Sequence, residues 1–214
     1  MELTMQISTP AVRSTTTSTS WNHTGAGDCS CSCSGSHDVP ADVFVPSTPS
    51  ASDQERRTEL GQLLWERYLD GRLDLLPVQV SGRNDGADAR SNIADTALGR
   101  DAKLSTYGNA PGGRVPLTFS LLEGLKSLSE EFSFRLTALV GGSHSSRSRH
   151  YLGVGMDVDT IDGVRVDKDH PKFRDFMNKA RQLGATEVLG PGSRGHDRHL
   201  HIAWPRDAKA TDSD

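Results

Sequence analysis

Two segments in the second half of the chain alternate between apolar residues and polar or small ones, and this pattern constrains the fold most. In residues 154–159, valine or methionine alternates with glycine or aspartate, and in residues 199–204 histidine or alanine alternates with leucine, isoleucine and tryptophan. A period of two predicts β-strands with one apolar face, which should pack against helices. The other face stays open. It would carry Asp157 on one strand and His199 and His201 on the other.

Patterns elsewhere predict that helices and further strands complete an α+β domain. Apolar residues recur at helical spacing after Ser52-Asp53, after Thr118 and after Pro171. Asp162-Gly163 is a hairpin turn signal. The order of elements predicts an antiparallel sheet with helices packed on one face. Helices are expected over residues 54–69, 92–98, 119–128 and 171–183, and further strands over residues 73–80, 134–140, 164–166 and 186–189.

The first quarter of the chain differs in kind from the rest. Residues 1–52 are crowded with serine and threonine, have few aliphatic residues and show no periodicity. Such a segment buries too little apolar surface to offset its ordering entropy, so we predict a disordered tail. Residues 53–207 have a length that suits one compact domain, followed by a disordered C-terminus over residues 208–214.

Composition excludes several classes of function. The net charge is −4 and the pI about 6.0, with no basic block, so we expect no nucleic-acid partner. No apolar run reaches the ~18 residues of a membrane span, and residues 1–12 show no secretory signal. Cys29, Cys31 and Cys33 all lie in the tail, which predicts a folded domain without disulfide or thiol chemistry. We expect a monomer.

Two motifs point to a metal site. Ser148-x-His150-x-x-Gly-x-Gly-x-Asp157 is followed by His196-Asp-Arg-His199-Leu-His201. A histidine and a carboxylate seven residues apart, with a late His-x-His, supply three protein ligands and leave a position open for water, as catalytic zinc sites do. His199 and His201 share one strand face, so spacing leaves open which of them is the ligand. Taken alone, His150 and Asp157 also fit a loop histidine and a strand-end aspartate without metal.

The first motif resembles the Ser-x-His-x-x-Gly-x-Ala-x-Asp signature of the zinc D-Ala-D-Ala carboxypeptidases, with Gly155 in place of alanine. The segment Gly-His-Asp-Arg-His-Leu-His, residues 195–201, resembles the last motif of penicillin-insensitive murein endopeptidase. Both belong to the LAS metallopeptidases, which also include lysostaphin-type enzymes and the hedgehog signalling domain. The resemblance covers residues 134–204. It implies a hedgehog/D-Ala-D-Ala-peptidase-like fold and a Zn²⁺ cofactor.

The resemblance also implies a role for each site residue. His150, Asp157 and His201 would be the zinc ligands, and His199 the general base and acid. His196 would assist the proton transfer or orient a neighbour. Ser148 would contact the substrate, and His144, Arg147 or Arg149 would replace an arginine that polarises the substrate in many relatives.

At three positions the sequence departs from the family pattern or allows a second interpretation of the residue's role. Arg198 stands where the carboxypeptidases carry glutamate, which is why the implied base is a histidine. His144 fits an ordinary loop residue equally well. Asp159 would accept a hydrogen bond from a ligand imidazole or simply be solvated.

These features predict zinc-dependent hydrolysis of an amide bond in a peptidoglycan stem peptide, by a D-Ala-D-Ala carboxypeptidase or a murein endopeptidase. That chemistry leads us to expect a periplasmic or extracellular location, although no signal peptide is visible. Two alternatives remain open: a non-catalytic zinc-bearing binding module, and an intracellular peptide-processing protease.

Overall fold

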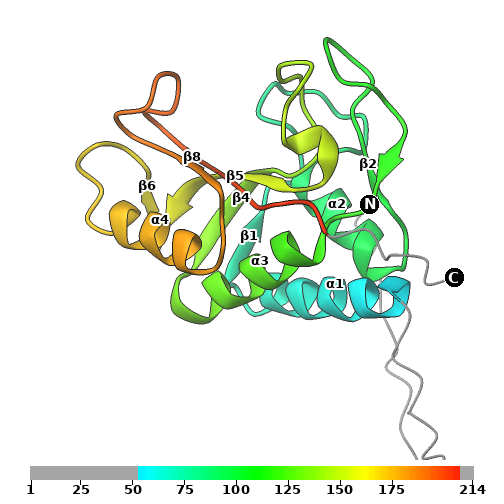
Figure 1. Ribbon diagram of the computed structural model, residues 1–214, viewed down its shortest axis with the longest axis horizontal. Helices are drawn as coiled ribbons and strands as arrows, with labels where there is room; N and C mark the ends of the chain where they lie inside the picture. Colours follow the sequence, from blue (N-terminus) through cyan, green and yellow to red (C-terminus); the bar gives the residue numbers. More distant parts are fainter. Residues whose placement is uncertain (1–52, 208–214) are drawn as a thin grey trace, which may run out of the picture. The chain divides into compact units, whose positions relative to one another are not determined.

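The computed structural model describes residues 53–207 of the 214-residue chain. This part has an α+β fold with four α-helices and a mixed β-sheet (Figure 1). The predicted disorder of residues 1–52, with their three cysteines, and of residues 208–214 falls outside the described residues. Among residues 53–207, no helix combines the length and the apolar character needed to cross a bilayer.

The main sheet has six strands, and one of its pairings departs from the antiparallel pattern predicted above. Strands β1 and β4 are parallel, and every other pair in this sheet is antiparallel. The sheet is therefore mixed. Helices α2 (Ala89–Ala97) and α3 (Phe119–Glu131) lie between β1 and β4 in the sequence, and parallel neighbours need such a long crossover. The strand order is β1 (Leu73–Leu75), β4 (Phe134–Ala138), β5 (Gly155–Ile161), β8 (Leu200–Ala203) and β7 (Glu187–Leu189), with β6 (Val164–Arg165) paired to β5.

Strand β1 is shorter than the predicted strand over residues 73–80. It ends at Leu75. Pro77 follows closely and has no backbone N–H to donate to a neighbouring strand. Residues 76–88 form a loop instead, and residues of this loop line one wall of a cleft.

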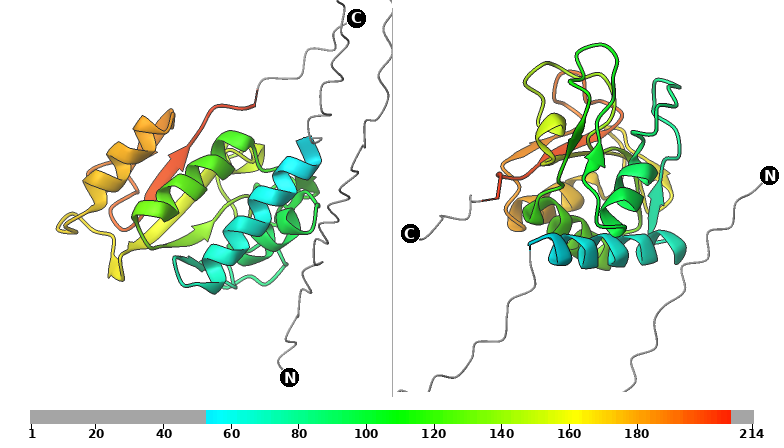
Figure 2. Two further views of the ribbon diagram at one scale, coloured as in Figure 1. Left: turned by 90° about the horizontal axis from the view of Figure 1, so that it is seen from below. Right: turned by 90° about the vertical axis from the view of Figure 1, so that its right-hand side faces the viewer.

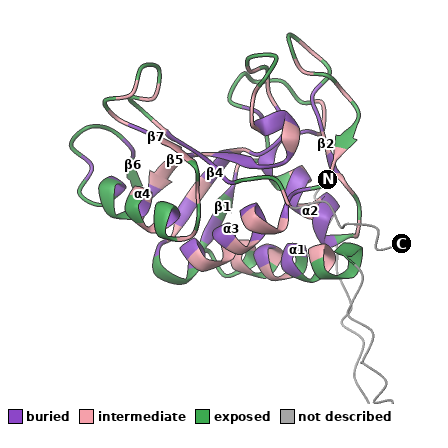
Figure 3. Cartoon of the chain, in the orientation of Figure 1, coloured by how far each residue is buried: buried purple, intermediate pink, exposed green. Residues whose placement is uncertain are grey.

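Three of the helices cover one side of the sheet. Helices α1 (Asp53–Leu69), α3 and α4 (Phe173–Gln182) lie below the strands in Figure 1 and in front of them in the left view of Figure 2. In Figure 3 the exposed residues of α1 and α4 lie mostly on the side away from the sheet. The predicted helices are confirmed. Four leucines of α3 are completely buried in the core: Leu121, Leu122, Leu125 and Leu128.

Helix α3 also approaches the end of strand β8 closely. The ring of Trp204, directly after β8, packs on Gly124, where a Cβ atom would come within 2.4 Å of the ring. Trp204 is buried, and its indole Nε1 donates to the backbone oxygen of Leu183 over 3.0 Å. This packing anchors the strand that carries His201.

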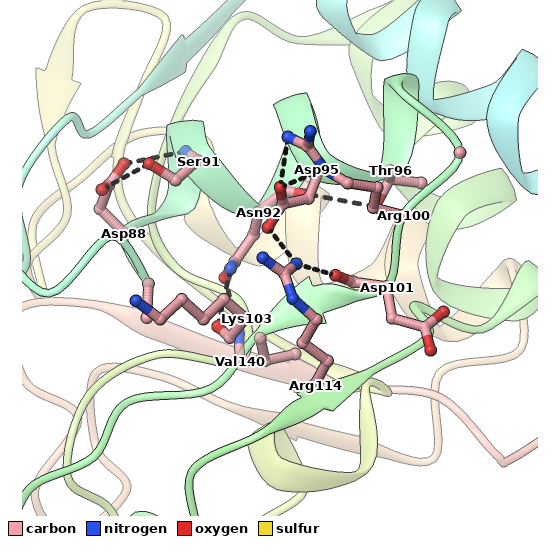
Figure 4. Close-up of polar contacts among 12 residues, drawn as sticks. Asp88, Ser91, Asn92, Asp95, Thr96, Arg100, Asp101, Lys103, Arg114 and Val140 are labelled. Atoms are coloured by element: carbon pink, nitrogen blue, oxygen red, sulfur yellow. Dashed lines mark hydrogen bonds and ion pairs between the residues drawn. The ribbon is translucent and has the colours of Figure 1, made fainter.

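A second, two-stranded sheet was not predicted. Strands β2 (Ala102–Lys103) and β3 (Arg114–Val115) pair antiparallel. Each is only two residues long, too short for a period of two to show in the sequence. Asp95 of helix α2 holds this hairpin through ion pairs of 2.8 Å with Arg114 and with Arg100 (Figure 4).

The buried side chain of Asn92 links helix α2 to both sheets (Figure 4). Its Nδ2 donates to the backbone oxygen of Lys103 over 3.0 Å, and its Oδ1 accepts from the backbone N–H of Val140 over 3.2 Å. Nearby, the Ser105 hydroxyl accepts from the N–H of Gly142 over 2.9 Å. Helix α2 and the hairpin therefore fix the start of the loop that carries His144.

Candidate metal centre

His150 lies in a short 3-10 turn, η1 (His150–Leu152), just before strand β5. Gly153 ends the turn with a φ of 69°, a left-handed conformation that glycine adopts without strain. The His150 side chain is buried, and its Nδ1 bonds to the backbone oxygen of Leu139. Because a carbonyl oxygen only accepts hydrogen bonds, Nδ1 carries the proton and Nε2 keeps its lone pair.

Asp157 and His201 stand directly opposite each other in the antiparallel pair of β5 and β8. Asp157 Oδ1 lies 2.9 Å from His201 Nδ1 and 3.3 Å from His150 Nε2. The two imidazole nitrogens are 3.1 Å apart. The structure thus brings together one atom from each of the three residues for which zinc ligation was predicted.

These separations fit a single small ion. Tetrahedral ligands at about 2.0–2.1 Å from zinc lie about 3.4 Å from one another, close to the distances in this triangle. The donor set of two imidazole nitrogens and one carboxylate oxygen is also typical of catalytic zinc. The rings of His150 and His201 are inclined at 61°, so their planes intersect and both lone pairs can be directed at one point.

The local electrostatics favour an ionised carboxylate at the centre of the triangle. Burial raises the pKa of Asp157, but the adjacent His150 and His201 lower it more, so it stays well below its usual range. Burial lowers the pKa of His150, whereas the Asp157 carboxylate raises it, and the net shift is upward. The site therefore stabilises positive charge beside Asp157, as a cation site must.

A looser grouping places His144 beside His150 and Asp157, with one potential ligand atom of each within 4.8 Å of the others. The His144 ring is stacked on that of His150, with centroids 4.0 Å apart and planes only 16° from parallel. Imidazole nitrogens bind a metal in the plane of the ring. An ion in the plane of His150 would therefore lie far out of the plane of His144. We favour His201 over His144 as the third ligand for this reason.

Glu187, which no pattern in the sequence singled out, contacts the candidate centre. Its Oε1 lies 3.1 Å from His201 Nε2, on the opposite side of the ring from Asp157. Its Oε2 lies 3.6 Å from Arg149 Nε. In the sequence, Glu187 is a single acidic residue in a predicted strand. Such a residue does not indicate a metal site until the pairing of β7 with β8 is known.

The two remaining histidines of the last motif lie beside the triangle. Strand β8 begins at Leu200, so His199 lies in the preceding loop and not, as predicted, within the strand. Its ring centroid is 4.9 Å from that of His196, which in turn lies 6.0 Å from that of His201. His199 is half-buried, and burial lowers its pKa more than the Asp157 carboxylate raises it. A neutral imidazole of this kind is suited to accept a proton.

The residues predicted to contact substrate line the same region. Ser148 is half-buried, and its hydroxyl accepts from the backbone N–H of His150 over 3.3 Å, which helps to shape the turn. His144 donates from Nε2 to the Gly141 oxygen over 3.0 Å. Burial is the main reason why its pKa is lowered.

Two clefts meet at the candidate centre. The larger has a volume of about 470 Å³, and its walls include Gln79, Val80 and Tyr107 from the loops before α2 and within the hairpin. The smaller, of about 320 Å³, runs along Ser148, Arg149 and Glu187. The linings of both include His144, Asp157 and His199. The smaller cleft therefore exposes all three residues of the triangle, and the larger one reaches it at Asp157.

Asp159 does not contact the ligand imidazoles. It accepts two bonds from Arg135, of 2.8 and 3.0 Å, and forms an ion pair of 2.9 Å with Arg165. Both predicted roles, an acceptor for a ligand histidine and a free solvated aspartate, are wrong. The pairing of β5 with β4 and β6 brings both arginines to this aspartate.

No family model, curated protein or solved structure matches this chain.

Proposed function

We propose that this protein is a zinc-dependent peptidase of the LAS type that hydrolyses an amide bond in peptidoglycan stem peptides. The observation that carries the proposal is the convergence of His150 Nε2, Asp157 Oδ1 and His201 Nδ1 within 3.3 Å of one another where two clefts meet. The two motifs that resemble the LAS group support it. The proposal includes a hedgehog/D-Ala-D-Ala-peptidase-like form of the α+β fold and a periplasmic or extracellular location.

His150, Asp157 and His201 would hold the ion. When bound, zinc supplies Lewis-acid chemistry: it polarises a carbonyl group and lowers the pKa of water. His199 accepts the proton of the attacking water and returns it to the departing amine. His196, next to His199, orients that imidazole. Ser148 borders the smaller cleft, where it contacts the substrate.

The clefts favour an endopeptidase over a carboxypeptidase. A carboxypeptidase releases a single C-terminal residue, so its site needs little space on the C-terminal side of the scissile bond. Here each cleft has a volume within the range of pockets that hold whole small-molecule ligands. Within residues 53–207, the guanidinium groups of Arg198 in the larger cleft and Arg147 in the smaller have no hydrogen-bond or ion-pair partner, so both are free to bind substrate carboxylates.

Two other functions compete with this one. A zinc-bearing binding module would share the triangle, but it does not need the half-buried His199 beside it. An intracellular peptide-processing protease would share the chemistry and differ in substrate. Neither has an observation of its own in its favour.

The test combines metal analysis with hydrolysis of purified muropeptides, followed by mass spectrometry. We expect the wild-type protein to hold stoichiometric zinc and to cleave a stem peptide. His201→Ala should lose the zinc and the activity. His199→Ala should keep the zinc and lose about 10²–10⁴-fold in kcat, the usual contribution of a general base.

Full activity of His201→Ala at unchanged zinc content would refute the ligand assignment. Zinc without cleavage of any cell-wall peptide would favour the binding module. Cleavage of unrelated peptides alone would favour the processing protease.

A further inference from the structure

The Glu187 carboxylate lies beside the outer nitrogen of His201, within ion-pair distance. His201 directs Nδ1 at Asp157 and His150, and its Nε2 faces Glu187 Oε1 over 3.1 Å. An ionised carboxylate only accepts hydrogen bonds. Without an ion, Nδ1 therefore donates to Asp157 Oδ1 over 2.9 Å. When a metal ion binds Nδ1, the remaining ring proton lies on Nε2, where it faces Glu187.

The sheet register explains why Glu187 reaches this nitrogen. In the antiparallel pair of β7 and β8, Leu189 stands opposite His201 and Glu187 opposite Ala203. Glu187 and His201 are thus diagonal neighbours on one face, roughly 7–8 Å apart at the backbone, a distance that a glutamate spans.

Arg149 restrains the far side of the same carboxylate. Its Nε lies 3.6 Å from Glu187 Oε2, and it directly precedes the ligand His150 in the chain. Glu187 therefore connects the turn that carries one candidate ligand with the strand that carries another. The Arg149 and Glu187 side chains are 40% and 35% exposed, so their ion pair adds little stability in itself. Its effect is on orientation.

We propose, on the basis of the metal site proposed above, that Glu187 is a positioning residue that fixes the tautomer and ring orientation of His201 for metal binding. Outer acceptors of this kind commonly contribute 10–100-fold to metal affinity, because a ligand held in place loses no orientational freedom when the ion binds. A rival role is that of a general base, because Glu187 lines the smaller cleft and could take a proton from water there. The positioning role requires only an oxygen that accepts a hydrogen bond, whereas the role of a general base requires an ionisable carboxylate.

A glutamine at position 187 separates these roles. Its amide oxygen still accepts the Nε2 proton of His201, but it is no general base. Zinc affinity would be measured by competition with a chromogenic chelator for wild type, Glu187→Ala, Glu187→Gln and the control Glu131→Ala. Glu131 is a second partly exposed, ion-paired glutamate, 2.7 Å from Lys179 and on helix α3. For the same four proteins, we would also record the absorption spectrum of the Co²⁺-loaded form and the thermal unfolding of the metal-free form.

We expect Glu187→Ala to bind zinc 10–100-fold more weakly, with an altered Co²⁺ spectrum and unchanged unfolding of the metal-free protein. Glu187→Gln should recover most of the affinity and the wild-type spectrum, and Glu131→Ala should match wild type. Zinc affinity of Glu187→Ala within twofold of wild type would overturn the positioning role and leave the metal site intact. Equal losses in Glu187→Gln and Glu187→Ala would overturn it too, since the acceptor alone would not suffice. A wild-type protein that binds no zinc would overturn both this role and the proposed function.

Discussion

Each candidate ligand imidazole directs one nitrogen at the centre and faces an acceptor with the other. For His150 the acceptor is the backbone oxygen of Leu139, which no side-chain substitution removes. For His201 it is the side chain of Glu187. His144 differs from both, because its Nε2 is bonded to Gly141 and its ring lies parallel to that of His150. Ring orientation therefore decides which of these histidines bind an ion.

His144→Phe tests this distinction. Phenylalanine preserves the ring stacked on His150 but has no nitrogen. If His144 supports the site only by packing, zinc affinity should stay within a few fold of wild type. His201→Phe should abolish tight binding, since it removes one of three ligands. Zinc titration of both variants makes the comparison, and tight binding by His201→Phe with loss in His144→Phe would reverse the assignment.

Helix α2 supports the site from a distance. Its Asn92 joins it to Val140, just past the end of β4, and to Lys103 of the hairpin (Figure 4). Asp88 caps the helix by accepting from the N–H of Ser91 over 2.9 Å. The loop with His144 follows directly from the residues that Asn92 fixes.

We expect Asn92→Ala to lower the free energy of unfolding by about 2–4 kcal/mol. The substitution leaves the buried N–H of Val140 and the oxygen of Lys103 without their partner, and an unsatisfied buried polar group costs roughly 1–3 kcal/mol. Guanidinium unfolding of the metal-free protein measures the change. Ser91→Ala, which removes only a hydroxyl bonded to Asp88, is the matched control and should cost less than about 1 kcal/mol. Equal effects of the two substitutions would contradict a special role for Asn92.

In the described domain as a whole, the helices that form the core and the loops that form the candidate site lie on different sides of the sheet. Helices α1, α3 and α4 lie on one side of the sheet, and long loops lie on the other (Figure 1). Residues of these loops line the two clefts. The larger cleft is lined by residues 79–81 and 107, and the smaller by residues 187, 189 and 196. A peptide chain that occupied both clefts would pass Asp157, which lines each of them.

This arrangement predicts faster cleavage of cross-linked muropeptide dimers than release of terminal D-alanine from a monomeric pentapeptide. The longer substrate fills both clefts and gains binding energy from the part beyond the scissile bond. Mass spectrometry of the products, with kcat/KM for each substrate, shows whether dimer cleavage or D-alanine release is faster. Release of D-alanine from monomers, with dimers untouched, would identify a carboxypeptidase instead.

Particular residues show how far prediction from sequence reached. Alternation placed Asp157 and His201 on open faces of two strands, and the structure pairs them directly. The same pattern gave no pairing partner for Asp159, which two arginines from neighbouring strands hold. It also extended the last strand to include His199, although β8 begins one residue later. A period of two shows which way a side chain points but not which strand lies beside it.

By itself, the sequence determined the α+β class and the helices, because periodicity is a local property of the chain. Ligand spacing offered His150 and Asp157 with either His199 or His201, and only the resemblance to the LAS group chose His201. Tertiary structure decided the parallel pairing of β1 with β4, the stacking of His144 on His150 and the contact of Glu187 with His201. These depend on the register and packing of segments far apart in the chain. Strand register is set only when the whole apolar face is buried at once.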